Sequence, residues 1–394
     1  MLTEQNALER IDAAAAALQA YPGGHHGRGV VVPGGGPRYF PCTWVCINML
    51  REAGCDWPVE LWHLGPAEMT DAMRSLVEPL GVRCVDALEV RRSHPARRLG
   101  GWELKCYAIL HSSFQEVLLL DADNVPLVNP AYLFDAPEYR KHGAVFWPDY
   151  GRLAPARPVW NLTGVPYRDE PEFETGQVVV DKARCWGPLS LAMWMNGHSD
   201  FWYRHVHGDK DTFHLAWRKL GAEYAMPPYP IRPLPGVMCQ HDFAGRRVFQ
   251  HRNLAKWTLH GHNPRVPGFL HEDLGLAFLD DLRRRWAGRP RPYRPGEGDE
   301  RTRRAAEDLC DRPWVYRRMG HDERPMTFRP DGTVGEGAAG CERAWGLTSR
   351  EETFDLSILG RDGVTCVLTP DGPARWHGAW VVHERMPVEL VARR

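Results

Sequence analysis

The chain has 394 residues, enough for two domains, and 43% hydrophobic with 25% charged residues is typical of an ordinary soluble protein. The formal net charge of −1 argues against binding of nucleic acid through overall electrostatic attraction, so we expect no such partner. We find no run of about 18 apolar residues and no basic stretch leading into an apolar one at the N-terminus. We therefore expect no membrane span, no secretory signal and a cytoplasmic location. The 10 cysteines lack a Cys-x-x-Cys pair, which favours free thiols over a disulfide framework.

The first 282 residues alternate short apolar runs with helical patterns. The predicted strands cover 29–33, 59–64, 82–85, 116–120 and 144–147, and a polar turn enters another buried strand within 172–181. The predicted helices cover 3–20, 42–52, 66–80, 102–112, 185–196, 201–206 and 207–220, and short strands at 236–241 and 248–251 each end in histidine. This alternation predicts an α/β fold with an open, mainly parallel sheet flanked by helices.

One strand in this series is distinguished by the residues at its end. The fully apolar run Val117–Leu120 leads into Asp121 and Asp123, after which Asn124 and Pro126 are expected to stop the regular structure. Ligands bind at the carboxyl ends of parallel strands, and Asp-x-Asp there can offer two oxygen ligands to one divalent cation beside phosphate oxygens. A solvated turn is the alternative explanation for a lone Asp-x-Asp.

The first predicted strand ends in Gly34, Gly35 and Gly36. Glycines at a strand end allow the backbone to approach a ligand and expose N–H groups, which is a hint of a nucleotide site. The segment matches neither a P-loop nor Gly-x-Gly-x-x-Gly, and a plain turn explains it equally well.

The C-terminal part differs from the first 282 residues in composition and in its predicted elements. Residues 283–312 are rich in Arg, Pro and Gly and are predicted to be a linker between a domain at 1–282, with an N-terminal helix in 1–24, and a second domain at 313–394. Short strands at 326–328, 354–358 and 364–368, with Asp-Gly turns at 331–332, 362–363 and 371–372, predict a small antiparallel β-module. Its tryptophans at 345, 376 and 380 form either its core, which we favour, or a sugar-binding surface.

With these residues in view, 28–275 resembles the fungal-type α-mannosyltransferases of the Golgi and their soluble bacterial relatives. The resemblance rests on several motifs in the same order: Pro58–Trp62, Gly101–Lys105, Glu116–Pro126, Phe146–Asp149, Glu174–Gln177, Gly208–Asp211 and Gln250–Arg252. It implies a GT-A fold and retaining transfer of a hexose from a nucleotide-sugar to a hydroxyl acceptor, either a glycan or a small molecule. GDP-mannose is the favoured donor and a UDP-sugar the second choice, with Mn²⁺ or Mg²⁺ as cofactor.

A more distant resemblance, to retaining galactosyl- and glucosyltransferases of the same fold, suggests further roles. It implies that His251 is the third metal ligand beside Asp121 and Asp123, and that Lys256, just before a tryptophan, holds the diphosphate. Lys105 either supplies fixed positive charge to the diphosphate or pairs with one of the two aspartates.

The remaining candidate residues are expected around this site. Residues Gly34 to Gly36, Trp62 and Gln177 are expected at the nucleotide-sugar. The distant resemblance implies that Asp209, Lys210 and Asp211 lie against the sugar near the anomeric carbon. Asp209 and Asp211 are expected to bind sugar hydroxyls or the acceptor. Retention without an obvious nucleophile fits front-face attack, and Glu174 is the candidate nucleophile for a double displacement.

Two other classes of function stay open at this level. Sugar nucleotidyltransferases also place paired aspartates on α/β sheets, and the segment from Gly34 to Arg38 loosely mimics their triphosphate loop. A carbohydrate-binding protein with an inactive transferase domain is the third possibility. The residues do not indicate an oligomeric state, and acceptor docking and oligomerisation are equal hypotheses for the β-module.

Overall fold

The computed structural model describes residues 2–66, 68–259, 263, 265–286, 292–296, 298–349, 354–360, 364–380 and 386–393. The chain divides into two compact units, Met1–Lys256 with Arg265–Leu279, and Trp257–Pro264 with Asp280–Arg394. Helix α12 (Glu300–Asp311) forms inside the segment that the sequence assigns to a linker, and residues 287–291 of that segment lie outside the described residues.

A six-stranded sheet forms the centre of the first unit, in the order β3-β2-β1-β4-β7-β6. The strands are β1 (Arg28–Pro33), β2 (Val59–His63), β3 (Val82–Asp86), β4 (Glu116–Leu120), β6 (Ala144–Pro148) and β7 (Phe173–Asp181). Strands β1 to β4 are parallel to one another, and β7 runs antiparallel between β4 and β6. The predicted α/β fold with a mainly parallel sheet is therefore confirmed.

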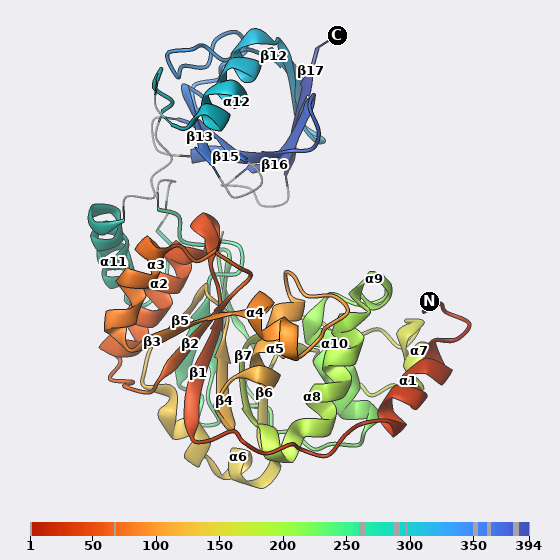
Figure 1. The fold of residues 1–394 in the computed structure, drawn as a ribbon. Coiled ribbons are helices and arrows are strands. Elements are labelled where there is room, and N and C mark those ends of the chain that lie inside the picture. Colours follow the sequence, from red (N-terminus) through yellow and green to blue (C-terminus); the bar gives the residue numbers. More distant parts are fainter. Residues whose placement is uncertain are drawn as a thin grey trace. The chain divides into compact units, whose positions relative to one another are not determined.

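Helices cover both faces of this sheet (Figure 1). One face carries α2 (Gly36–Glu52) and α3 (Asp71–Val77), and the other carries α5 (Glu103–His111), α8 (Lys182–Gly197) and α10 (Asp209–Lys219). The apolar side chains of α5, α8 and α10 pack with those of β1, β4 and β7 into a continuous buried cluster, which explains why these strands read as unbroken apolar runs. None of the helices within the described ranges has the length and apolar character needed to cross a membrane.

A second, four-stranded sheet has the order β5-β10-β9-β8. It contains β5 (Asn124–Pro126), β10 (Arg247–His251), β9 (Val237–His241) and β8 (Arg232–Leu234). The expectation that Asn124 and Pro126 stop regular structure is wrong, because these residues pair antiparallel with β10. Proline is tolerated at the end of so short an edge strand, and a partner remote in sequence supplies the pairing.

Several helix boundaries also differ from the sequence prediction. Helix α2 begins at Gly36 rather than at 42, and α1 is shorter than expected, at Ala7–Ala16. Helix α3 begins at Asp71 behind the capping hydroxyl of Thr70 and ends in a 3₁₀ turn, η1 (Glu78–Leu80). The other elements of this part are α4 (Ala87–Ser93), η2 (Pro130–Asp135), α6 (Pro137–His142), α7 (Val159–Thr163), α9 (Ser199–Trp202) and α11 (Glu272–Arg285).

The second unit contains a seven-stranded antiparallel sheet in the order β12-β11-β17-β16-β15-β14-β13. Its strands are β11 (Trp314–Arg318), β12 (Asp322–Met326), β13 (Ala344–Ser349), β14 (Phe354–Leu359), β15 (Val364–Pro370), β16 (Arg375–Trp380) and β17 (Pro387–Ala392). Trp345 and Trp376 are buried in its core together with Leu309 of α12, and Trp380 packs against that core. The predicted turn at 362–363 lies outside the described residues.

Candidate active site

The carboxyl edge of the parallel strands gathers the chemistry-bearing residues of the first unit. Gly34 follows β1, Asp121 follows β4 and Asp149 follows β6, while the antiparallel β7 begins at this same edge with Phe173. The carboxyl edge is where ligands bind in open α/β sheets.

Asp121, Asp123 and His251 converge at this edge, with one potential ligand atom of each lying within 4.8 Å of the others. His251 Nε2 is 3.1 Å from Asp123 Oδ1 and 3.7 Å from Asp121 Oδ2. The three residues expected to form a metal site are therefore brought together, although 128 residues separate Asp123 from His251.

Two pairing registers create this convergence. Strand β10 places His251 opposite Asn124 of β5, so the imidazole lies beside the preceding Asp123. The Asp121 amide donates to the carbonyl of Gly176 on β7 at 2.8 Å, which holds the end of β4 against the start of β7. The second register was invisible in the sequence because it depends on a strand more than 50 residues downstream.

Two lysines contact the aspartates. Lys105 Nζ of α5 is 2.8 Å from Asp121 Oδ2 and 3.5 Å from Asp209 Oδ2. Lys256 Nζ contacts Asp123 Oδ2 and donates to the Asn253 carbonyl at 2.8 Å. Burial works against the charge of Lys105, but Asp121 and Asp209 outweigh it and raise the pKa of its ammonium group. Both lysines therefore bring positive charge to the aspartates.

The cluster is electrostatically asymmetric. Burial raises the pKa of Asp121 to about 6, against the opposing effect of Lys105 and His251. Burial also opposes the charge of Asp123, but His251 and Lys256 prevail and hold the pKa of this carboxyl below its usual range. Burial disfavours a proton on His251, yet Asp123 and Glu174 raise the pKa of the imidazole to about 10. The cluster thus strongly favours positive charge between its carboxylates.

Glu174 and Gln177 support this cluster from β7. Glu174 Oε1 lies 3.2 Å from His251 Nδ1 and accepts the Gly176 amide at 2.8 Å, while its Oε2 accepts from Gln177 Nε2 at 2.6 Å. Gln177 is fully buried and its Oε1 accepts from Asn124 Nδ2 at 2.8 Å. Gln177 therefore links Glu174 to Asn124, and both polar atoms of its amide have a partner within the protein.

The three residues from Asp209 to Asp211 divide between two clusters. Asp209 Oδ2 accepts the Thr175 hydroxyl at 2.8 Å and belongs with Lys105. Lys210 Nζ instead contacts Glu172 and lies 2.8 Å from Asp149 Oδ2.

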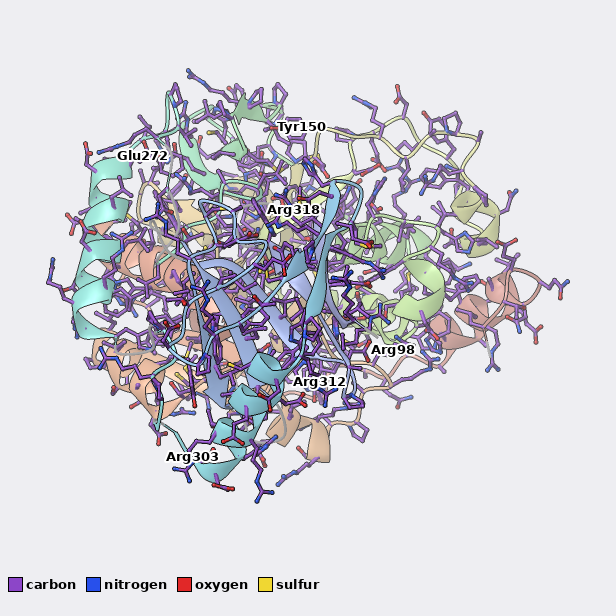
Figure 2. The ribbon with its side chains drawn as sticks, turned by 90° about the horizontal axis from the view of Figure 1, so that it is seen from above. Arg98, Tyr150, Glu272, Arg303, Arg312 and Arg318 are labelled. Atoms are coloured by element: carbon purple, nitrogen blue, oxygen red, sulfur yellow. The ribbon has the colours of Figure 1, made fainter. Side chains whose placement is uncertain are left out.

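Asp211 closes this second cluster, and burial raises the pKa of its carboxyl. Its Oδ1 lies 3.5 Å from Lys210 Nζ and its Oδ2 accepts the His207 amide at 2.8 Å. Tyr150, next to Asp149, is 58% exposed and is labelled in Figure 2. Asp149 and Tyr150 come directly after the Phe-Trp-Pro end of β6, a polar break after an apolar run that could have identified them as candidates.

The glycine segment reaches the site only through Gly34. A β carbon on Gly34 would lie 3.2 Å from the β carbon of Ala122, between the two aspartates, and 2.5 Å from Thr43 Oγ1. Gly35 and Gly36 pack against the backbone of Glu68. Trp62 is fully buried, donates to Glu60 at 2.9 Å and packs edge-on against Tyr107, so its indole lies in the core and away from the cluster.

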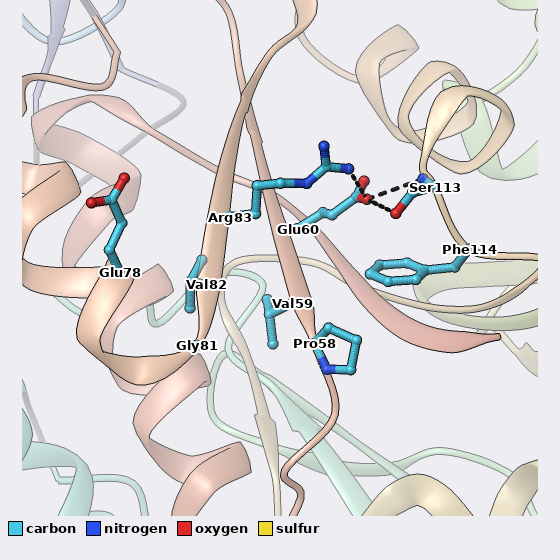
Figure 3. Close-up of a pocket in the computed structure, with 9 residues that line it drawn as sticks. All are labelled: Pro58, Val59, Glu60, Glu78, Gly81, Val82, Arg83, Ser113 and Phe114. Carbon is cyan, nitrogen blue, oxygen red and sulfur yellow. Dashed lines mark hydrogen bonds and ion pairs between the residues drawn. The ribbon is translucent and has the colours of Figure 1, made fainter. Parts of the chain in front are cut away.

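A pocket of about 330 Å³ lies at the opposite edge of the same sheet (Figure 3). It is lined by the starts of β2 and β3 and by Ser113 and Phe114, which precede β4. Glu60 in this pocket accepts hydrogen bonds from Arg83 and from the amide and hydroxyl of Ser113. None of the predicted site residues lines it, and its buried carboxylate is already satisfied by the protein.

Comparison with known protein families shows to which family the chain belongs. The model of the family described as "Mannosyltransferase putative" matches residues 27–159 and 167–244, which is more than half of the chain. The chain belongs to this mannosyltransferase family, as its motifs suggested. The matched residues contain Lys105, Asp121, Asp123, Glu174 and Asp209.

Curated relatives point the same way. The chain is 30% identical over 240 residues to alpha-1,2-mannosyltransferase MNN24 of Candida albicans, covering 50% of this chain and 34% of that protein. It is 27% identical over 252 residues to MNN21 of the same organism, covering 50% and 38%. It is 25% identical over 286 residues to MNN2 of Saccharomyces cerevisiae, covering 60% and 47%. The chain thus spans less than half the length of these relatives.

Among solved structures, the chain is similar to the galactosyltransferase LgtC, with a TM-score of 0.36 and 15% identity over 50% of this chain and 73% of that one. It is also similar to mouse xyloside xylosyltransferase 1, with a TM-score of 0.34 and 15% identity over 51% and 84%.

Proposed function

We propose that this chain is a metal-dependent retaining hexosyltransferase that moves mannose from GDP-mannose to a hydroxyl acceptor. The observation that carries the proposal is the cluster of Asp121, Asp123 and His251, flanked by Lys105 and Lys256, in a member of a mannosyltransferase family. The acceptor is a glycan or a small molecule.

The residues present fit a divalent cation. Two carboxylate oxygens and one imidazole nitrogen converge within 4.8 Å, and the donor set suits Mn²⁺ or Mg²⁺ with phosphate oxygens completing the shell. The electrostatic environment that raises the pKa of His251 would favour a cation in the same place. When bound, such a cation supplies charge neutralisation and Lewis acidity to the leaving diphosphate.

The chain's own residues then take distinct parts. Lys105 and Lys256 carry positive charge to the place where the leaving nucleoside diphosphate gains negative charge, and they orient Asp121 and Asp123. Asp209, beside Lys105, accepts hydrogen bonds from hydroxyls of the transferred sugar or of the acceptor. Gly34 keeps the backbone of the β1–α2 turn close to the aspartates on the nucleotide side.

The surroundings of Glu174 favour front-face attack over a double displacement. Both of its carboxylate oxygens already accept hydrogen bonds from β7, and its Oε1 faces His251. A carboxylate held in this way is suited to orient the imidazole, whereas a nucleophile needs an oxygen aimed at the anomeric carbon. In front-face attack the acceptor oxygen bonds to the anomeric carbon, and its proton passes to the departing phosphate oxygen.

The test is nucleotide release from a panel of GDP- and UDP-sugars, with Mn²⁺, Mg²⁺ or a chelator. We expect GDP release from GDP-mannose that requires the metal and that Asp121→Asn and Asp123→Asn abolish. Asp181→Asn is the matched control, because this carboxylate ends β7 at the opposite edge and caps α8. Release of pyrophosphate from a sugar phosphate and a nucleoside triphosphate would indicate a nucleotidyltransferase instead. Metal-independent turnover, or full activity in either aspartate variant, would overturn the proposal.

A further inference from the structure

Trp102, the residue before α5, is an exposed aromatic side chain with a fixed position. It is 56% exposed, and its ring lies against Gly208. A β carbon on Gly208 would be 2.8 Å from Cε3 and 3.0 Å from Cζ3 of the indole, and the φ of +99° at this position also favours glycine. The Tyr203 ring lies beside the indole, with centroids 6.0 Å apart. The ring is therefore supported by the protein while much of its surface faces solvent.

Both Trp102 and the glycine beneath it are tied to the candidate active site. Lys105 follows Trp102 by three residues, which is about 4.5 Å along a helix axis, and its Nζ is 2.8 Å from Asp121. Gly208 directly precedes Asp209, whose carboxylate is 3.5 Å from the same Lys105 Nζ. Trp102 thus lies about one helical turn from Lys105 along the backbone, and the glycine that supports its indole directly precedes Asp209. We assign Lys105 to the diphosphate and Asp209 to the sugar.

The side of the sheet on which Trp102 lies indicates which part of a nucleotide-sugar it could contact. Gly34 leads into α2 on one face, whereas α5 and α10 cover the other (Figure 1). If the nucleoside approaches along the Gly34 turn, the sugar side of the cluster is the side of Asp209 and Trp102. This step rests on the proposed function.

We propose that Trp102 is a stacking platform for a pyranose ring at the active site. The face of an indole carries a negative quadrupole, which attracts the polarised C–H groups on the apolar face of a pyranose. Asp209, next to the supporting glycine, accepts hydrogen bonds from the hydroxyls at the sugar's edge. The pyranose is either the hexosyl group of the donor or the acceptor sugar, and both have the chemistry that this surface recognises.

The experiment compares Trp102→Ala and Trp102→Phe with Tyr229→Ala as matched control. Tyr229 is also an exposed aromatic supported by a glycine, since a β carbon on Gly245 would lie 2.8 Å from its ring. It lies near His241, which pairs with Arg247 at the end of β10 remote from His251. The measurements are GDP affinity with Mn²⁺, kcat/KM for GDP-mannose hydrolysis, and KM for methyl α-D-mannopyranoside as acceptor probe. Saturation-transfer NMR of methyl pyranosides reports binding without turnover.

We expect Trp102→Ala to leave GDP affinity unchanged and to change one sugar-dependent quantity about tenfold, either by lowering kcat/KM for GDP-mannose hydrolysis or by raising KM for the mannoside. Trp102→Phe and Tyr229→Ala should stay close to wild type in all of these quantities. A loss in donor hydrolysis assigns the platform to the donor sugar, and a raised KM for the mannoside assigns it to the acceptor. Equal sugar-dependent values in Trp102→Ala and wild type overturn the platform alone. A parallel loss of GDP affinity also overturns it, because the ring would then stack on the base. Absence of turnover in the wild type overturns the proposed function. The NMR experiment then tests the platform alone: the pyranoside signal should be present in wild type and disappear in Trp102→Ala. Absence of a pyranoside signal in wild type overturns the platform.

Discussion

Adding one methyl group, by Gly176→Ala, should test whether His251 binds a metal or has only a structural role. Gly176 lies on β7 directly beneath the imidazole, and a β carbon there would be 2.4 Å from His251 Nδ1, 2.7 Å from Cε1 and 2.9 Å from Glu174 Oε1. Ordinary van der Waals contact begins at 3.4 Å, so Gly176→Ala must displace the ring by about 1 Å, the difference between 3.4 and 2.4 Å.

This displacement is large on the scale of coordination chemistry. Metal–ligand distances hold within about 0.2 Å, so a shift of 1 Å removes His251 from a shared cation. Altered support of a ligating histidine typically costs about 10- to 100-fold in metal affinity, and a 1 Å misplacement at a reacting centre can cost about 100-fold in rate. Overpacking costs folding stability about 1–3 kcal/mol. We therefore expect a folded protein whose Mn²⁺ affinity and kcat/KM both fall by these factors.

The assay is calorimetric titration of Mn²⁺ in the presence of GDP, with a thermal melt in chelator to measure the cost to folding separately. Gly340→Ala is the control, since a β carbon there would meet no atom within 4 Å. Mn²⁺ affinity in Gly176→Ala within a factor of two of wild type, in a folded protein, would refute the assignment of His251 as a ligand.

Three further outcomes are expected. Lys256→Met, which removes the cation beside Asp123, should lower kcat/KM about 100- to 1,000-fold while Mn²⁺ still binds; unchanged turnover would contradict its role at the diphosphate. Lys182→Met should destabilise folding by about 1–3 kcal/mol in urea titrations, because the carbonyls of Leu110 and Ser112 lose their buried donor. Burial lowers the pKa of Lys182 from 10.5 to about 7, so the unfolded state binds the extra proton between these values. The wild-type unfolding free energy should therefore rise between pH 7 and 10 by more than that of the variant, and parallel pH profiles would contradict this. Trp345→Ala, in the core of the β-module, should cost about 3–5 kcal/mol of that unit's stability, measured by its thermal unfolding.

The sequence was most informative about features that depend on residues close together in the chain. The apolar run from Val117 to Leu120 is typical of a strand buried on both faces, and this pattern predicts that the aspartates behind it lie at the carboxyl edge of a parallel sheet. The alternation of strands and helices likewise predicts the α/β class. The boundary of α2 was missed because Gly36 and the residues after it read as a loop, while in the fold the Gly36 amide donates to the backbone of Glu68.

Other parts of the site depended on partners that no local pattern contains. Lys210 was expected beside Asp209 at the sugar, but neighbouring residues at the start of a helix point in different directions, and the carboxylates of Asp149 and Glu172 draw it into a separate cluster. Trp62 belongs to a recognisable motif, yet strand alternation turns its ring into the core.

By itself, the sequence determined the fold class, the family and the paired aspartates, because burial patterns and motif order are written along the chain. Only the tertiary structure decided that His251 lies against Asp123, that the Gln177 amide bonds to Glu174 and Asn124, and that Trp102 stands over Gly208 near Asp209. These contacts arise from strand registers and helix packing between segments remote in sequence, and such distances are set by the whole packed core rather than by any local propensity.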